Sequence, residues 1–232
     1  MKYEDFVAEL AKYADDQISA HSSRFFKSGE GEYGEGDQFI GVRVPITRKV
    51  CKDFKDLPLG EVQKLLDSPI HEHRLAAVII LTDQFQKNQK QVYDFYLKNV
   101  YSGRVNNWDI VDTSAHKIVG PYLLDRPRDL LFVLAESENI WQRRVAVIST
   151  FYFIKLGDAS TCIEIAEKLL NDDHDLIHKA VGWMLREVGS RDGEEILLDF
   201  LNKNAVHMPR TMLRYAIEKL PENKRQYYLR LN

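Results

Sequence analysis

The chain has 232 residues and a formal net charge of −3, with 44% hydrophobic and 29% charged residues. That length suffices for one sizeable core, and the composition excludes disordered, collagen-like and fibrous proteins. The longest clean apolar run, Leu75 to Leu81, is far shorter than the roughly 20 residues of a membrane helix. The first residues carry no secretory signal, and two distant cysteines, Cys51 and Cys162, form neither a disulfide framework nor a thiolate zinc site. We therefore expect a cytoplasmic protein with no membrane partner.

An acidic leader opens the chain. Residues 1–38 hold four basic and nine acidic side chains, whereas the remainder has a small positive excess. Residues 29–34 spell G-x-G-x-x-G, but no strand is predicted before them and their glutamates would repel a phosphate. We therefore expect an acidic, Gly-rich loop near residues 28–37, not a dinucleotide site.

The rest of the chain has the pattern of helices. Apolar residues recur at spacings of three and four from Leu57 to the end, which predicts an all-α protein. Pro45, Pro127 and Pro221 fit the first turns of helices, and Asp172 or Asp173 is a candidate N-cap for a helix running through Trp183. No Pro- or Ser-rich hinge interrupts the pattern, so we predict a single domain over residues 1–232.

An internal repeat of 35 residues organises these helices. Five short segments align, and their second residues are Arg74, Asp109, Arg144, Lys179 and Arg214. A fixed period filled with helix pairs predicts a stacked α-solenoid, here right-handed and roughly C-shaped.

Each repeat has two distinct helical faces. Counted from the second residue, positions +1, +2, +5 and +6 share one face at about 100° per residue. They are largely apolar or small, so they form the predicted buried stripe. The second residues lie on the opposite face, as four cations and one carboxylate, and predict a concave basic groove. A solvated face without a ligand is the alternative for any single arginine.

A group of residues that could do chemistry lies on this second face. Trp108 and Asp112 are four residues apart and therefore neighbours, and Trp183 and Arg144 occupy the same face of later repeats. Indoles attract cations, a carboxylate stabilises developing positive charge, and arginine binds phosphate. A patch of all four would suit an alkylated purine nucleotide. Alternatively, both tryptophans pack between repeats and Asp112 pairs with Arg143 or Arg144.

At these residues the sequence resembles the AlkD-type DNA alkylation repair family, the HEAT-like-repeat DNA glycosylases. The matching segments are Trp-Asp-Ile-Val-Asp at 108–112, Asn-Ile-Trp-Gln-Arg-Arg at 139–144, Lys-Ala-Val-Gly-Trp-Met-Leu-Arg-Glu at 179–187 and Phe-Ile-Gly-Val-Arg-Val-Pro at 39–45. The resemblance runs from about residue 20 to residue 220.

The resemblance implies a DNA glycosylase of base excision repair that acts without metal or organic cofactor. Its substrates would be cationic N3- or N7-alkylated purines in double-stranded DNA. Asp112 would stabilise the sugar as it becomes an oxocarbenium ion and position the attacking water. Trp108 and Trp183 would contact the nucleotide that bears the lesion, and Arg144 would hold a nearby phosphate. Further backbone contacts are implied for Arg43, Arg48, Lys179, Arg186 and Arg214.

Two other functions fit a helical-repeat chain. One is a non-catalytic binder of damaged or branched DNA, and the other is a protein-interaction scaffold. Metal binding is not favoured, because two histidines at i and i+2, such as His71 and His73, diverge on a helix. The cysteines have no evident base partner. We expect a monomer.

Overall fold

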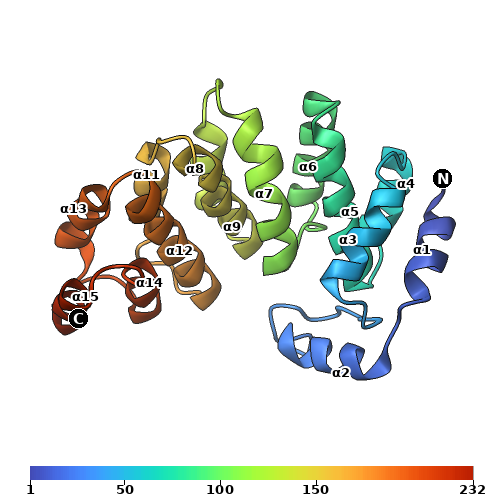
Figure 1. Cartoon of the computed structure of the whole chain (residues 1–232), viewed down its shortest axis with the longest axis horizontal. Coiled ribbons are helices and arrows are strands. Elements are labelled where there is room, and N and C mark those ends of the chain that lie inside the picture. The colour runs from blue at the N-terminus through green and yellow to red at the C-terminus, as the bar shows by residue number, and fades with distance from the viewer. Residues whose placement is uncertain (232) are drawn as a thin grey trace. The chain divides into compact units, whose positions relative to one another are not determined.

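The computed structural model describes residues 1–231, and every regular element in that part of the chain is a helix (Figure 1). A single isolated β-bridge, between Gln38 and Ile70, accompanies the helices of these residues. The fold is an all-α solenoid of helix pairs, as predicted. The chain forms two compact units, one from Met1 to Ser114 and one from Ala115 onward.

The first unit is built around one helix that is buried along most of its length. Its elements are α1 (Tyr3–Ala11), α2 (Asp16–Phe25), α3 (Val44–Asp53), α4 (Leu59–Leu66), α5 (His71–Phe85), α6 (Gln89–Tyr101) and the first residues of α7 (Trp108–Tyr122). Helix α5 packs against α3, α4 and α6. It is buried on all sides from His71 to Leu81, so polar residues on it must find partners inside the protein.

The second unit is centred on its longest helix. It holds the rest of α7, then α8 (Asp129–Ala135), α9 (Ile140–Ser149), α10 (Phe151–Ile154), α11 (Ser160–Lys168), α12 (Asp175–Arg191), α13 (Glu194–Asn204), α14 (Arg210–Ala216) and α15 (Glu222–Leu231). Helix α12 packs against α9, α10, α11, α13 and α14. This helix therefore positions much of the second unit.

The 35-residue repeat corresponds to one helix of each pair. The second residues of the five segments lie within α5, α7, α9, α12 and α14. The predicted buried stripe is confirmed throughout the first four repeats. It is wrong at two positions of the fifth, where Tyr215 and Lys219 are exposed. Helix α14 ends at Ala216, so Lys219 lies beyond the helical face that was extrapolated to it.

The predicted basic face is partly wrong. Arg74 is only 5% exposed because α5 is covered on all sides. Its guanidinium donates to the carbonyls of Ser68 and Pro69 at 3.1 and 3.2 Å and to Asp37 at 2.5 Å. Arg74 is thus a structural cation of the first unit.

The helix-start predictions have mixed outcomes. Pro45 lies in the first turn of α3, whereas Pro127 and Pro221 precede α8 and α15. The prediction of an aspartate cap on α12 is wrong. His174 is the N-cap, and its Nδ1 accepts from the amide of Leu176 at 3.1 Å.

No helix within residues 1–231 combines the length and apolarity that crossing a membrane requires.

Candidate nucleic-acid interface

A buried carboxylate shapes the loop that precedes α3. Glu72, on α5, accepts hydrogen bonds from the amides of Ile40, Gly41 and Val42 at 2.8 to 3.2 Å. Gly41 has φ of +78° and lies so close to the backbone of Asp15 that a Cβ atom would collide with it. These contacts explain why the 39–45 segment carries glycine at this position.

The loop leads directly to two of the predicted DNA contacts. Arg43 is the N-cap residue of α3, and Arg48 follows within the same helix. Both are exposed, and neither forms an ion pair with any residue in the described part of the chain. Their positive charges are therefore available to an external anion.

Trp108 begins α7 and lies in a cluster of aromatic rings. Its indole stacks on Phe26, with centroids 5.2 Å apart and planes at 14°, and meets the edge of Phe25 at 5.9 Å. Trp108 remains half-buried, while Phe25 is 56% exposed. The rings fix the indole in place and leave part of its surface accessible.

A buried ionic network supports this cluster. The two ring nitrogens of His71 pair with Asp37 at 3.0 Å and with Asp109 at 2.8 Å. Asp37 also accepts from Arg74 at 2.5 Å and from Asn107 at 3.2 Å. Two carboxylates and two cations therefore balance one another in the interior of the first unit.

The network keeps His71 charged. Burial alone would lower the pKa of His71, but the charges of Asp109 and Asp37 and their hydrogen bonds raise it to about 9. Burial raises the pKa of Asp37, yet the hydrogen bond from His71 and the charge of Arg74 bring it below its ordinary value. At neutral pH the centre of the network is an imidazolium between two carboxylates.

The same network fixes the start of α7. The side chain of Asn107 accepts from the amide of Trp108 at 2.9 Å, and Asp109 accepts from the amide of Ile110 at 2.8 Å. Sequence reasoning missed this role, because His71 was considered only as a metal ligand. The sequence did contain a signal for this role. His71, Glu72 and His73 are consecutive polar residues at the start of a buried helix, and such residues need partners inside the protein.

Asp112 lies one turn after Trp108 and is half-buried. It lies near Tyr96, a fully buried phenol whose hydroxyl is 2.8 Å from that of Ser114. Burial raises the pKa of Tyr96, and the negative charge of Asp112 raises it further, while the hydrogen bond with Ser114 opposes both. The predicted neighbours Trp108 and Asp112 thus share a helix that is anchored at its first turn.

In the second unit, Trp183 lies on α12 and is half-buried. Its indole meets the ring of Phe151 with centroids 6.0 Å apart. The preceding residue, Gly182, lies against the backbone of Met212 and the side chain of Tyr215 on α14. Glycine therefore lets the two helices approach closely beside Trp183.

The prediction that Arg144 faces solvent is wrong, since the residue is only 5% exposed. Its guanidinium donates to the carbonyl of Leu176 at 2.5 Å and so links α9 to α12. Arg143, the other candidate partner of Asp112, binds Asp172 at 2.6 Å. A role for Arg144 in phosphate binding stays a prediction.

The three remaining predicted contacts differ in their partners. Lys179 pairs with Asp175 at 2.6 Å, and Arg186 pairs with Glu218. Arg214 is exposed and forms no ion pair within residues 1–231. Arg214 is thus the predicted contact of the second unit that is most available to an anion.

The four residues of the predicted patch belong to different units. Trp108 and Asp112 lie in the first unit, and Arg144 and Trp183 lie in the second. Their convergence in one hollow stays a prediction.

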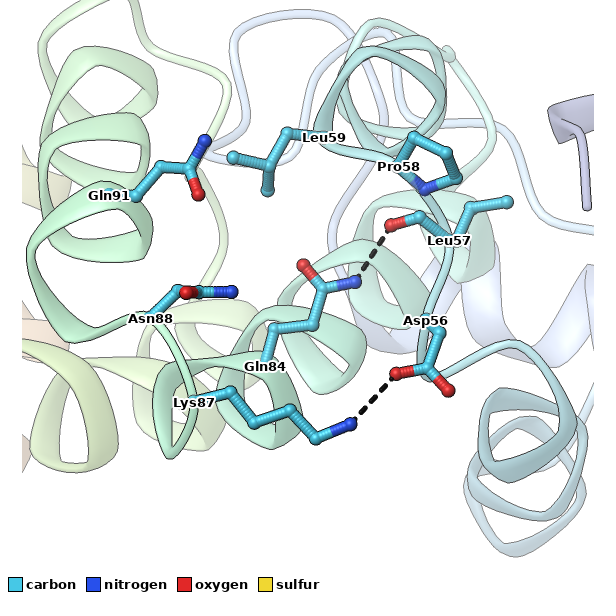
Figure 2. Close-up of a pocket in the computed structure, with 8 residues that line it drawn as sticks. All are labelled: Asp56, Leu57, Pro58, Leu59, Gln84, Lys87, Asn88 and Gln91. Atoms are coloured by element: carbon cyan, nitrogen blue, oxygen red, sulfur yellow. Dashed lines mark hydrogen bonds and ion pairs between the residues drawn. The ribbon is translucent and has the colours of Figure 1, made fainter.

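Two pockets lie apart from these side chains. The pocket in Figure 2 has a volume of about 260 Å³ and is lined by residues 56–59, Gln84, Lys87, Asn88 and Gln91. Gln84 donates to the carbonyl of Leu57 at 2.7 Å, and Lys87 pairs with Asp56 at 3.0 Å across it. A second pocket, of about 560 Å³, has Glu136, Lys168 and the ion pair of Arg143 with Asp172 in its lining. Neither includes a predicted site residue.

Both cysteines of the chain are buried. Burial raises the pKa of both Cys51 and Cys162 to about 12, so both are thiols at neutral pH. Within residues 1–231, no group of three or more His, Cys, Asp or Glu side chains is arranged to hold a metal ion.

The fold and these side chains define a helical-repeat protein with partly accessible indoles and several exposed arginines. The sequence model of the family described as DNA alkylation repair enzyme matches residues 6–220, and the chain belongs to this family. A solved structure described as a predicted DNA alkylation repair enzyme from Enterococcus faecalis has the same fold. The TM-score is 0.71 and the identity 16%, over 90% of this chain and 97% of that one. No curated protein matches the chain significantly.

Proposed function

We propose that the protein is a DNA glycosylase that hydrolyses the N-glycosidic bond of cationic N3- or N7-alkylated purines in double-stranded DNA. The observation that carries the proposal is the pair of Trp108 and Asp112, half-buried on successive turns of α7. The ionic network around His71 holds the first turn of that helix in place. Family membership supports DNA repair as the setting.

The proposed reaction needs one carboxylate and one water molecule. As the bond from C1′ to the purine nitrogen breaks, its electron pair neutralises the cationic base, which leaves without a general acid. The sugar becomes an oxocarbenium ion, which the negative charge of Asp112 stabilises. Water adds to C1′ and gives its proton to Asp112 or to solvent. The two-carboxylate arrangement of glycoside hydrolases is therefore unnecessary.

The indoles and arginines have binding roles in this proposal. Trp108, fixed by Phe26, and Trp183, beside Phe151, contact the nucleotide that carries the lesion. The exposed cations Arg43, Arg48 and Arg214 neutralise backbone phosphates.

Base release from alkylated duplex DNA tests the proposal. We expect the wild-type protein to release 7-methylguanine, and Asp112→Asn to release it about 10²–10³-fold more slowly, because the neutral amide cannot stabilise the oxocarbenium ion. Release is measured by chromatography of the free base under single-turnover conditions.

Asp83→Asn is the matched control, since it removes one exposed carboxylate from α5 of the same unit. It should leave the rate unchanged. Undiminished release by Asp112→Asn would refute the assigned role. Absence of release by the wild type would refute the glycosylase proposal. In that case, affinity for duplex DNA would indicate a non-catalytic binder, and no affinity an interaction scaffold.

A further inference from the structure

A buried glutamate in the second unit is surrounded by more positive charges than its carboxylate can neutralise. Glu187, on α12, is only 5% exposed. It binds Arg191 at 2.8 Å and Lys219 at 3.4 Å, and Arg186 lies 3.7 Å away. Arg186 has a second partner in Glu218, so the surplus of positive charge lies with Arg191 and Lys219.

A fourth cation stands beside this group without a carboxylate. The ammonium of Lys155 lies 5.2 Å from the ring centres of both Phe151 and Tyr152. The guanidinium of Arg191 lies 5.4 Å from the same Phe151 ring. Lys155 forms no ion pair with any residue among 1–231. Burial and the neighbouring charge of Arg191 lower the pKa of Lys155.

Among these cations, Arg191 lies on the same face of α12 as Trp183, whereas Lys155 follows α10 and Lys219 follows α14. Trp183, Glu187 and Arg191 follow one another at intervals of four residues, and such residues are neighbours on a helix. Eight residues correspond to about 12 Å along the helix axis. Phe151 connects the two ends, because it contacts both Trp183 and Arg191.

Two like charges held beside one ring repel each other, and a bound anion would relieve that repulsion. Glu187 and Phe151 already restrain Arg191, which lowers the entropic cost of binding. The site is an open surface, so it suits an anion that is part of a long polymer.

We propose that Lys155, Arg191 and Lys219, here called the Lys155 patch, bind a backbone phosphate of the DNA strand whose nucleotide contacts Trp183. The inference rests on the proposed function, since it names a further contact to the same substrate.

Lys155→Gln is the cleanest probe, because it removes a charge without leaving a carboxylate unpaired. Binding to unmodified fluorescent duplex DNA is measured by anisotropy over a series of KCl concentrations. We expect weaker binding at low salt and a slope of log affinity against log salt that is shallower by about 0.9. Lys155→Arg should restore the wild-type slope.

Lys203→Gln is the matched control. Lys203 is an exposed lysine of α13 in the same unit, and it has no ion-pair partner within the described residues. Its loss changes the net charge equally and should leave the slope unchanged.

Equal slopes for Lys155→Gln and Lys203→Gln would overturn the inference about the Lys155 patch. In that case, base release by the wild-type protein would still support the proposed function. A shallower slope for Lys155→Gln alone, without base release, would support the patch and refute the glycosylase activity. A wild-type protein without affinity for duplex DNA would refute both.

Discussion

At the scale of single residues, His71 shows how burial changes the chemistry of a side chain. Its ring packs against those of Phe26 and Phe39, with centroids 4.6 and 4.9 Å away, and it is only 2% exposed. An imidazolium in such surroundings persists only because Asp37 and Asp109 bind both of its nitrogens. The charge state of His71 is therefore linked to the stability of the first unit.

We expect the stability contributed by His71 to fall as the pH rises. The pKa is about 9 in the folded protein against 6.5 for the free side chain, so the contribution is complete below pH 6.5 and is lost as the pH rises through 9. The loss should be about 3 kcal/mol in the free energy of unfolding. Urea denaturation at a series of pH values measures it.

In His71→Ala this dependence should disappear, and the protein should be less stable at pH 6 by about 3–5 kcal/mol, because Asp109 loses its cation and Asp37 loses one of two. His207→Ala, at an exposed histidine, should retain the wild-type profile. A His71→Ala profile parallel to that of the wild type would show that His71 does not carry this charge.

At the scale of helices, close approach decides where glycine is needed. Gly182 lies in the interior of α12, where glycine costs about 0.5–1 kcal/mol relative to alanine. Yet a Cβ at this position would lie 2.5 Å from the carbonyl oxygen of Met212 and 2.6 Å from the Cβ of Tyr215. The close contact between α12 and α14 therefore requires glycine at this position, despite its low helix propensity.

Gly182→Ala should destabilise the protein by about 1–3 kcal/mol, because α14 must move away from α12. Thermal unfolding measures the change. Gly60→Ala is the control, since nothing lies within 4 Å of the added Cβ near the start of α4. It should be neutral or stabilise by up to about 1 kcal/mol. Equal effects at both positions would exclude close packing as the cause.

At the scale of the whole molecule, one repeat runs through both compact units. The 35-residue period passes from α5 to α14 without a break in register. In repeat proteins each structural repeat is stabilised by contacts with the neighbouring repeats, so a short array of repeats unfolds cooperatively. The single domain predicted for residues 1–232 stays a prediction, and cooperative unfolding of the whole chain would support it.

A single domain should unfold in one transition. His71→Ala in the first unit and Gly182→Ala in the second should then shift the same midpoint, whether unfolding is followed by far-UV circular dichroism or by tryptophan fluorescence. Two transitions, each moved by only one of the variants, would mean that the units unfold independently.

The sequence by itself determined the helical class, the repeat and the buried stripe. Periodicity is a local property, because residues at +1, +2, +5 and +6 share a face wherever the helix continues. For the same reason it was predictable that Trp108 and Asp112 lie on one face of α7, on successive turns. The stripe was wrong at Lys219, where the helix had already ended.

Only the tertiary structure decided which charges are free. Arg74 and Arg144 have the same place in the repeat as the exposed Arg214, yet both are buried by neighbouring elements. The partners of His71 lie 34 and 38 residues away in sequence, and those of Glu187 include Lys219, 32 residues away. Ion pairs over such separations depend on how helices pack, and a local pattern of residues does not contain that information.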